Sequence, residues 1–460
     1  NSQTKIMKNL FGYDPTKTTI RTELLAGLTT FLTMSYILAV NPSMFSLLEG
    51  MSAGAVFTAT ALAAIVGSLA MALLAKMPFG LAPGMGLNAF FVYTVCMGMG
   101  YSWQIALLAV FAEGLIFVVL SLTNVREAIF NAIPLTLKRG VSVGIGLFIA
   151  FIGLQNAGLA VDSSTLVTIT DFTENFTTSG ICALLAIIGL LLTAIMHIRN
   201  VKGSILIGIV ATWLLGIICQ LTGLYTPTPE AGFYSLIPSS FISADFSALG
   251  DTFGQCFNVD FGSIRILDFI VVVFAFLFVD LFDTLGTLIG VATKAGMLDE
   301  KGRLPKIKPA LLADAIGTSS GAVLGTSTVT TFVESASGVE AGGRTGLASI
   351  VTSACFLLCL FLTPLAKLVP ACATAPALIY VGVLMLKGFA KVDMNDVRSA
   401  VPAFLALIMM PLTYSISNGI GIGCIAYTLI TLCTGKFKKT DIAVTVIAVL
   451  FVLRFCLITM

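Results

Sequence analysis

Two carboxylic acids stand three residues apart in the middle of a long apolar segment. Asp280 and Asp283 lie within the stretch 265–290 and are separated only by Leu281 and Phe282. Residues three apart share one face of a helix, so the two side chains are expected to point the same way. Burying an ionised acid without a partner is costly. The pair is therefore a candidate for binding a polar ligand or for holding a proton.

Asp314, Glu334 and Glu113 also lie within apolar stretches. No Lys, Arg or His occupies the middle of these stretches, which predicts that the acids are protonated or face a water-filled cavity. Asp280, Asp283 and Asp314 are the candidate proton carriers. Structural hydrogen bonding to Ser or Thr is an equal alternative for Asp283 and Asp314, and it is the favoured interpretation for Glu113.

Two short segments interrupt the apolar pattern. Residues 80–88 hold three Gly and one Pro, and residues 325–334 are rich in Thr and Ser. These compositions disfavour regular helix, and the second favours extended chain. Each segment is predicted to lead into a half-helix, the second from about Val333. The two N-termini would aim N–H groups at one polar ligand, and Gly86 would let that ligand approach the backbone. A Gly-rich helix-packing surface is the alternative.

The composition places these features in a membrane. Hydrophobic residues make up 57% of the 460 residues and charged residues 10%, against about 25% charged in soluble domains. Apolar runs near the ~20 residues that cross a bilayer recur along the chain. The ten Cys are scattered among them without a CxxC spacing, which is typical of packed thiols rather than of a metal site. The sequence therefore predicts an all-α membrane protein.

Fourteen transmembrane segments are predicted, seven in each half of the chain. They cover residues 22–40, 52–75, 82–98, 101–122, 138–159, 178–198, 202–222, 265–290, 308–325, 329–343, 345–366, 370–388, 398–413 and 416–434. With a cytoplasmic N-terminus, all Lys and Arg except Arg265, Lys367 and Arg454 fall on the cytoplasmic side, as the positive-inside rule requires. The stretch 440–458 is expected to be an interfacial or peripheral helix.

These spans predict five regions. They are a cytoplasmic N-terminus (1–21), a first repeat (22–222), an external loop (223–264), a second repeat (265–434) and a C-terminal segment (435–460). An odd number of spans in each half gives the two halves opposite orientations. Such inverted repeats, with broken helices at the midplane, are typical of secondary transporters.

Several motifs resemble the azaguanine-resistance-like (AzgA-like) purine permeases, a branch of the nucleobase–cation symporters related to the uracil and xanthine permeases. The resemblance runs along the whole chain and rests on residues 83–89, 280–287, 325–338, 370–376 and 414–420. It implies a seven-plus-seven inverted repeat, with a core domain (spans 1–4 and 8–11) and a gate domain (spans 5–7 and 12–14). Short antiparallel strands in spans 3 and 10 are expected to meet near the substrate.

The resemblance also implies a function and the residues that perform it. A symporter of the cytoplasmic (inner) membrane would import a purine nucleobase such as guanine, hypoxanthine or adenine together with protons. Asp280 and Glu334 would bind the base, Asn88 would line the site, and Asp314 would support coupling. The matching motifs add Gly86, Val333 and Ser335 to the substrate-binding candidates. The expected partners are the base, the lipid bilayer and a second copy of the chain in a homodimer. No nucleic acid, metal or cofactor beyond the proton is expected.

Other functions fit the sequence less well. A xanthine, uracil or small-anion transporter of the same fold is the alternative, although Asp280 and Glu334 would repel an anion. An intramembrane enzyme lacks the HExxH, Gly-x-Ser-x-Gly and Walker motifs, and a channel would not explain acids in two matching repeats.

The topology can be tested by labelling. In a Cys-depleted background, cysteines at positions 301 and 247 should react from opposite sides of the membrane, position 301 from the cytoplasm, because the linker 291–308 is rich in Lys and Arg. Labelling of position 301 from outside would overturn the span assignment.

Overall fold

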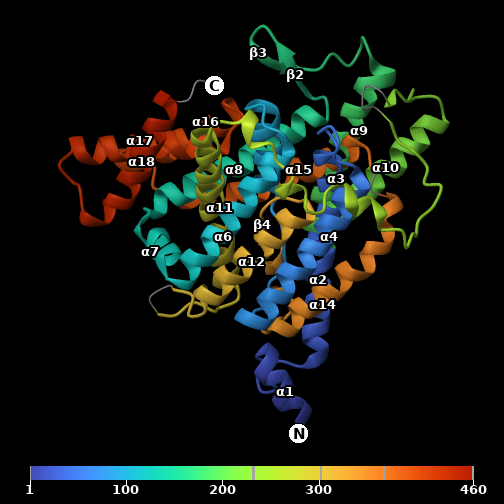
Figure 1. Cartoon of the computed structure of the whole chain (residues 1–460). Coiled ribbons are helices and arrows are strands. Elements are labelled where there is room, and N and C mark those ends of the chain that lie inside the picture. Colours follow the sequence, from blue (N-terminus) through green and yellow to red (C-terminus); the bar gives the residue numbers. More distant parts are fainter. Residues whose placement is uncertain (1, 230–233, 301–302, 366–367, 458–460) are drawn as a thin grey trace.

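The structure is a computed structural model that describes residues 2–229, 234–300, 303–365 and 368–457, and it consists mostly of helices (Figure 1). The first half forms α1 (Ser2–Phe11), α2 (Ile20–Met34), α3 (Ile37–Phe45), α4 (Ala53–Ala70), α5 (Met85–Ala89), α6 (Trp103–Leu122), α7 (Val125–Ala132), α8 (Leu135–Asn156), α9 (Ile181–Ile198) and α10 (Ser204–Leu221). The second half forms α11 (Ile266–Lys294), α12 (Ile307–Leu324), α13 (Ser335–Glu340), α14 (Gly346–Cys359), α15 (Ala371–Met385), α16 (Val397–Leu412), α17 (Ile416–Cys433) and α18 (Ile442–Leu457). The strands are β1 (Leu81–Pro83), β2 (Ala160–Ser163), β3 (Leu166–Ile169) and β4 (Val329–Thr331).

Many of these helices are suited to a bilayer. Among the described residues, nine helices are long and apolar enough to cross a membrane, and two shorter apolar helices cover Met85–Gly98 and Val397–Leu412. Large apolar side chains such as Leu214, Leu358 and Leu412 are more than half exposed on helix surfaces, as expected where lipid takes the place of water. The total of fourteen spans stays a prediction, and Lys301 and Lys367 lie outside the described residues.

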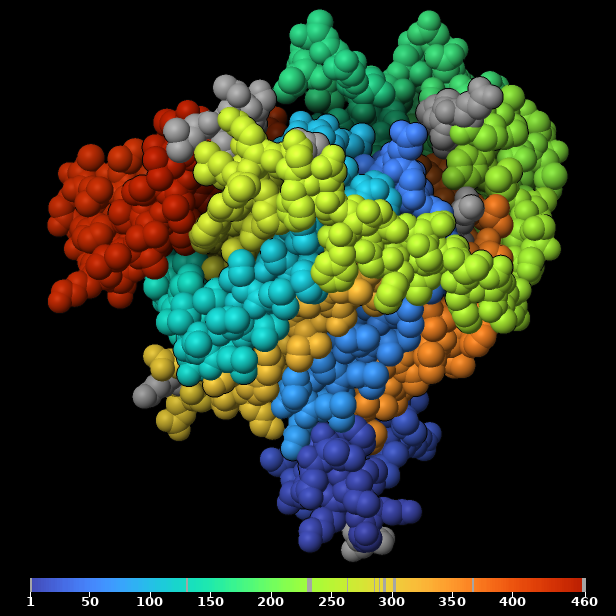
Figure 2. All heavy atoms as spheres, in the orientation of Figure 1, coloured from blue at the N-terminus to red at the C-terminus, as the bar shows by residue number. Residues whose placement is uncertain are grey.

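The helices pack in two groups, each drawing on both halves of the chain. In one group, α12 contacts α4 and α6, and α14 contacts α2 and α4. Figures 1 and 2 show the blue part of this group beside the orange α14. In the other group, α8 contacts α15 and α16, α16 contacts α17, and α9, α10 and α15 contact one another. Helix α11 contacts members of both groups, α6 in the first and α8 and α17 in the second. The division into core and gate domains stays a prediction.

The two segments that interrupt the helical pattern meet in the interior. Strand β1 pairs antiparallel with β4, and the register places Ala82 opposite Thr330. The pair is extended by hydrogen bonds from Gly84 N to Thr328 O and from Phe332 N to Gly80 O, both 3.0 Å long. All residues of both strands are buried. The pairing therefore satisfies backbone groups that would otherwise be costly at this depth.

The structure defines two of the expected elements in more detail. The half-helix expected from about Val333 begins at Ser335 and has six residues, because Gly342, at φ 106°, takes a left-handed conformation that ends helices. The two half-helices are therefore unequal, since α5 continues as a π-helix over Phe90–Gly98. The C-terminal stretch forms α18, which packs along α17, and its interfacial or peripheral position stays a prediction.

Gly338 of α13 marks a close approach between the two halves of the chain. A Cβ at this position would overlap with Thr30 Oγ1 and lie 2.7 Å from Ala26 O, both in α2. We therefore expect Gly338→Ala to lower the free energy of unfolding by about 1–3 kcal/mol through overpacking. Thermal unfolding of the detergent-purified protein measures this. Gly250→Ala is the control, since nothing lies within 4 Å of its added Cβ, and an equal effect of both variants would contradict the close contact.

Candidate functional site

Helix α11, which carries Asp280 and Asp283, contacts strand β4 and helix α5. It therefore lies near the point where the chain leaves β1 and enters α5. Gly84 lies at this point, and a Cβ on it would stand 2.5 Å from Thr330 Cγ2 and 3.4 Å from Asp283 Oδ2. The absence of a side chain thus lets the backbone lie close to both. The Asp283 carboxyl is also near enough to those of Asp280 and Glu334 to interact with them electrostatically. Asp283 therefore links the acids of α11 to the acid that follows β4.

Thr284 connects Asp280 to the neighbouring elements. Its hydroxyl lies 2.5 Å from Asp280 Oδ1, 3.2 Å from Asp314 Oδ2 and 2.9 Å from Thr330 Oγ1. One hydroxyl has a single proton to donate, so it bonds to one of these oxygens at a time or accepts from Thr330. Helices α11 and α12 and strand β4 are thus joined through one side chain.

Arg126 is the cation of this cluster, and its position corrects a prediction. The sequence assigned it to a cytoplasmic loop and predicted no cation beside the acids. In the structure its side chain is fully buried and Nη2 lies 2.8 Å from Asp314 Oδ2 and 3.6 Å from Asp280 Oδ2. Nη1 donates to Leu311 O at 3.2 Å. The guanidinium also lies 3.8 Å from the centre of the Phe117 ring, a cation–π contact.

A tight turn explains how Arg126 reaches the interior. Asn124, between α6 and α7, has φ 60°, a left-handed conformation that Asn tolerates better than most residues. The chain reverses there, and α7 packs back against α6 and α11. Arg126, two residues later, then points at the acids. This reversal has only a weak signal in the sequence, which is the Asn before the polar residues of α7.

Glu113 completes the cluster and has a closer relation to Asp280 than the sequence indicated. It is fully buried, and its Oε2 accepts a hydrogen bond from Thr328 at 3.0 Å. Its carboxyl also adjoins that of Asp280. The predicted hydrogen bond to a Thr is present, but the residue also belongs to the acid cluster.

The cluster contains more acid than base. One guanidinium faces three buried carboxyls, and one oxygen each of Glu113, Asp280 and Asp314 has no hydrogen-bond partner among the described residues. An unpaired buried carboxylate costs several kcal/mol. The arrangement is thus one in which protons, rather than further cations, can balance the charge.

Glu334 lies apart from this cluster, at the end of β4. Its Oε1 accepts a hydrogen bond of 2.5 Å from the Tyr36 hydroxyl, and its backbone carbonyl accepts one from Thr33 at 3.3 Å. The side chain is half-buried, and Val333 beside it is 40% exposed. Glu334 is thus held by the first span yet remains reachable, which a ligand-binding acid requires.

The remaining predicted residues make contacts within the protein. Asn88 is buried, and its amide donates to Asn41 Oδ1 at 2.5 Å and Pro83 O at 3.2 Å, whereas its own Oδ1 has no partner among the described residues. The Ser335 hydroxyl accepts from Gly80 N at 2.9 Å. A Cβ on Gly86 would lie 2.7 Å from Ile145 Cγ2 of α8. Gly86 therefore permits helix packing here, whereas the close approach near an acid occurs at Gly84.

Comparisons with known proteins agree with a transporter. The family model described as the permease family matches residues 21–422. The guanine/hypoxanthine permease PbuG of Bacillus subtilis is 46% identical over 458 residues, which cover 98% of this chain and 99% of that protein. The adenine permease AdeQ of Escherichia coli is 39% identical over 459 residues, covering 100% and 98%.

A solved structure agrees on the fold. The transmembrane domain of the cyanobacterial bicarbonate transporter BicA superimposes with a TM-score of 0.61 at 16% identity, over 86% of this chain and 97% of that one. At this level of identity the likeness shows that the two chains share a fold. Together with the family match, these similarities establish that the chain is a multi-pass membrane transport protein and belongs to the permease family.

Proposed function

We propose that this permease imports purine nucleobases together with protons across the cytoplasmic membrane, with its N-terminus inside. The observation that carries the coupling is the buried cluster of one guanidinium and three carboxyls beside the β1–β4 pair. The substrate class follows from the full-length similarity to permeases named for guanine, hypoxanthine and adenine.

The base would bind between Glu334, Asp283 and the chain around Gly84. Guanine presents N1–H and an exocyclic NH₂ side by side, and a carboxylate such as Glu334 accepts both. Hypoxanthine presents N1–H alone, and adenine would need a protonated carboxyl to donate to its N1. The Tyr36 hydroxyl, 2.5 Å from Glu334 Oε1, fixes the direction of the carboxyl. Asn88 and Ser335 would hold the backbone of the site in place, because Asn88 donates to Pro83 O and the Ser335 hydroxyl accepts from Gly80 N.

The proton would reside among Asp280, Glu113 and Asp314. Arg126 can neutralise one carboxylate, and the adjoining Asp280 and Glu113 carboxyls can share a proton. Asp283 interacts electrostatically with both Asp280 and Glu334, so the protonation of the cluster and the charge at the substrate site would affect each other. Binding of the base and of the proton are then linked energetically.

Transport assays test the proposal as a whole. Proteoliposomes with an imposed inward proton gradient should accumulate labelled guanine, hypoxanthine or adenine above the external concentration, and uptake should carry protons inward. Xanthine, uracil and small anions serve as alternative substrates in the same assay. Uptake that neither responds to the gradient nor moves protons would refute symport.

Glu334→Gln should change the selectivity among purines. Gln keeps the size of the side chain but presents one acceptor and one donor, so guanine should lose a charged hydrogen bond worth ~1.5–3 kcal/mol, or about tenfold or more in affinity. Adenine should lose less. Competition of unlabelled purines for uptake measures this. Glu340→Gln, an exposed acid at the end of the same helix, is the control, and equal losses for guanine and adenine would remove Glu334 from base recognition.

Arg126→Gln should destabilise the protein and abolish accumulation, because it leaves buried carboxylates without a cation. Losing one partner of a buried pair costs about 3–5 kcal/mol, and combining it with Asp314→Asn should restore part of that stability. Thermal unfolding and gradient-driven uptake measure the two effects. Arg398→Gln breaks a partly exposed pair with Asp396 and should cost about 0–1 kcal/mol. Strictly additive losses in the double variant would mean that Arg126 and Asp314 are not coupled.

A further inference from the structure

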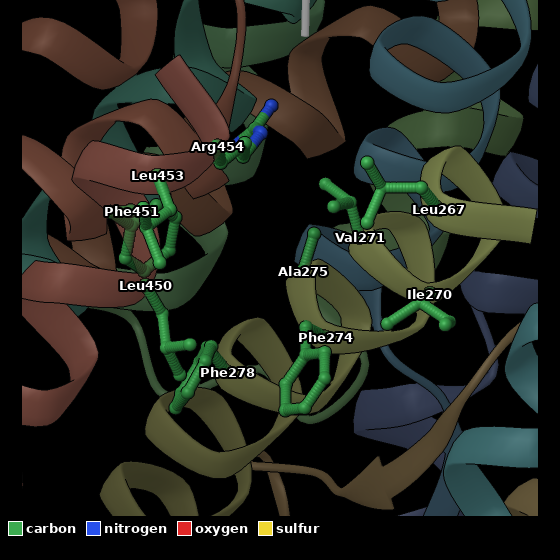
Figure 3. Close-up of a pocket in the computed structure, with 10 residues that line it drawn as sticks. All are labelled: Leu267, Ile270, Val271, Phe274, Ala275, Phe278, Leu450, Phe451, Leu453 and Arg454. Atoms are coloured by element: carbon green, nitrogen blue, oxygen red, sulfur yellow. The ribbon is translucent and has the colours of Figure 1, made fainter. Parts of the chain in front are cut away.

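An apolar groove on the surface of the molecule runs between α11 and α18 (Figure 3). Its volume is ≈ 180 Å³. Val271 and Phe274 of α11 line one wall, Phe451 and Leu453 of α18 line the other, and Arg454 lies at one end. Phe274 and Leu453 are 42% and 48% exposed, so the groove opens onto the surface that faces acyl chains.

Arg454 is the one charged residue that lines this groove. It is 8% exposed, and its Nη1 donates to Ser417 Oγ at 2.5 Å. No carboxylate among the described residues forms a salt bridge with it. A guanidinium carries five N–H donors, and a buried charge without a counter-charge is costly. The groove thus joins apolar walls to a cation that has no salt-bridge partner in the described part of the chain.

Neighbouring charges indicate the depth of Arg454 in the membrane. Leu267, in the first turn of α11, lines the same groove as Arg454 (Figure 3). The Arg265–Asp268 pair is at the first turn of α11, where Arg265 is 66% exposed. The guanidinium of Arg454 therefore lies near the level at which α11 enters the bilayer, which is the level of lipid head groups.

We propose that this groove is a binding site for one anionic phospholipid. An acyl chain would lie along the apolar walls, and the phosphate would accept hydrogen bonds from Arg454, the residue type best suited to bidentate phosphate contacts. The apolar walls would favour an acyl chain, and Arg454 would favour an anionic head group. A zwitterionic lipid presents a choline or ethanolamine cation beside its phosphate and should bind more weakly.

A lipid bound in the groove would contact α11, the helix that carries Asp280 and Asp283. Phe278 lines the groove and stands 5.8 Å, between ring centres, from Phe451 of α18. Asp280 follows Phe278 by two residues on the same helix. A bound acyl chain would therefore fix the part of α11 that leads into the carboxyl cluster. This inference rests on the membrane fold and does not depend on the identity of the transported base.

Lipid binding can be measured directly on the purified full-length protein. After delipidation in detergent, native mass spectrometry and thermal unfolding would follow titration with phosphatidylglycerol or with phosphatidylcholine of the same acyl chains. We expect one tightly retained phosphatidylglycerol and selective stabilisation by it. Arg454→Gln should weaken its binding about tenfold, the loss expected for a charge-assisted contact, and remove the preference.

Matched variants separate the charge from the apolar walls. Arg454→Lys should keep part of the preference, and Arg265→Gln, which removes a nearby exposed arginine, should keep all of it. Val271→Phe should weaken binding with Arg454 intact, because the larger ring occupies the groove. If Arg454→Gln fails to fold, the binding of the two phospholipids to Arg454→Lys and Val271→Phe tests the proposal.

Three outcomes would overturn the proposal. Equal binding of both phospholipids by the unmodified protein would mean that the groove holds ordinary annular lipid. An unchanged preference in Arg454→Gln, or unchanged phosphatidylglycerol binding in Val271→Phe, would place the lipid elsewhere. Equally tight binding of oleate would identify a fatty acid rather than a phospholipid as the occupant.

Discussion

The burial of Arg126 among three carboxyls constrains the centre of this protein. The guanidinium is bound by Asp314, the carbonyl of Leu311 and the ring of Phe117, so helices α6, α7 and α12 must meet around it. A charge at this depth is tolerated only with such partners. The surplus of acids over this one cation makes the cluster sensitive to protons, because each change of protonation alters a charge that water does not screen.

The paired strands β1 and β4 connect this cluster to Glu334. Short strands allow the backbone to change direction inside the membrane while their hydrogen bonds are made with each other. Thr328 and Thr330 reach the acids Glu113 and Asp280 directly or through Thr284, and Glu334 emerges at the end of β4 beside Tyr36. A shift of the strand pair would therefore affect the carboxyl cluster and Glu334 together.

Helix α11 combines several roles along its length. Its first turns line the apolar groove beside α18, its middle carries Asp280 and Asp283, and it contacts members of both packing groups. One helix thus adjoins the lipid-facing surface, the carboxyl cluster, and helices α8 and α17.

Much of this arrangement could be predicted from local sequence. Apolar length and the low content of charge determine a membrane protein of many spans, since nothing else can bury so many apolar residues. The cost of buried acids singled out Asp280, Asp283, Asp314 and Glu334, and the Gly, Pro and Thr content of the two broken segments predicted interrupted helices.

Contacts between distant residues could not be predicted in this way. Tyr36 beside Glu334, Asn41 beside Asn88 and Arg126 beside Asp314 join residues from different spans, and no local preference encodes such pairs. The prediction for Arg126 was wrong because the positive-inside rule assigns every arginine near a span end to a loop. The sequence by itself determined which charged groups are too costly to bury without a partner. Only the tertiary structure decided which partner each one has, because partners are set by how helices pack across hundreds of residues.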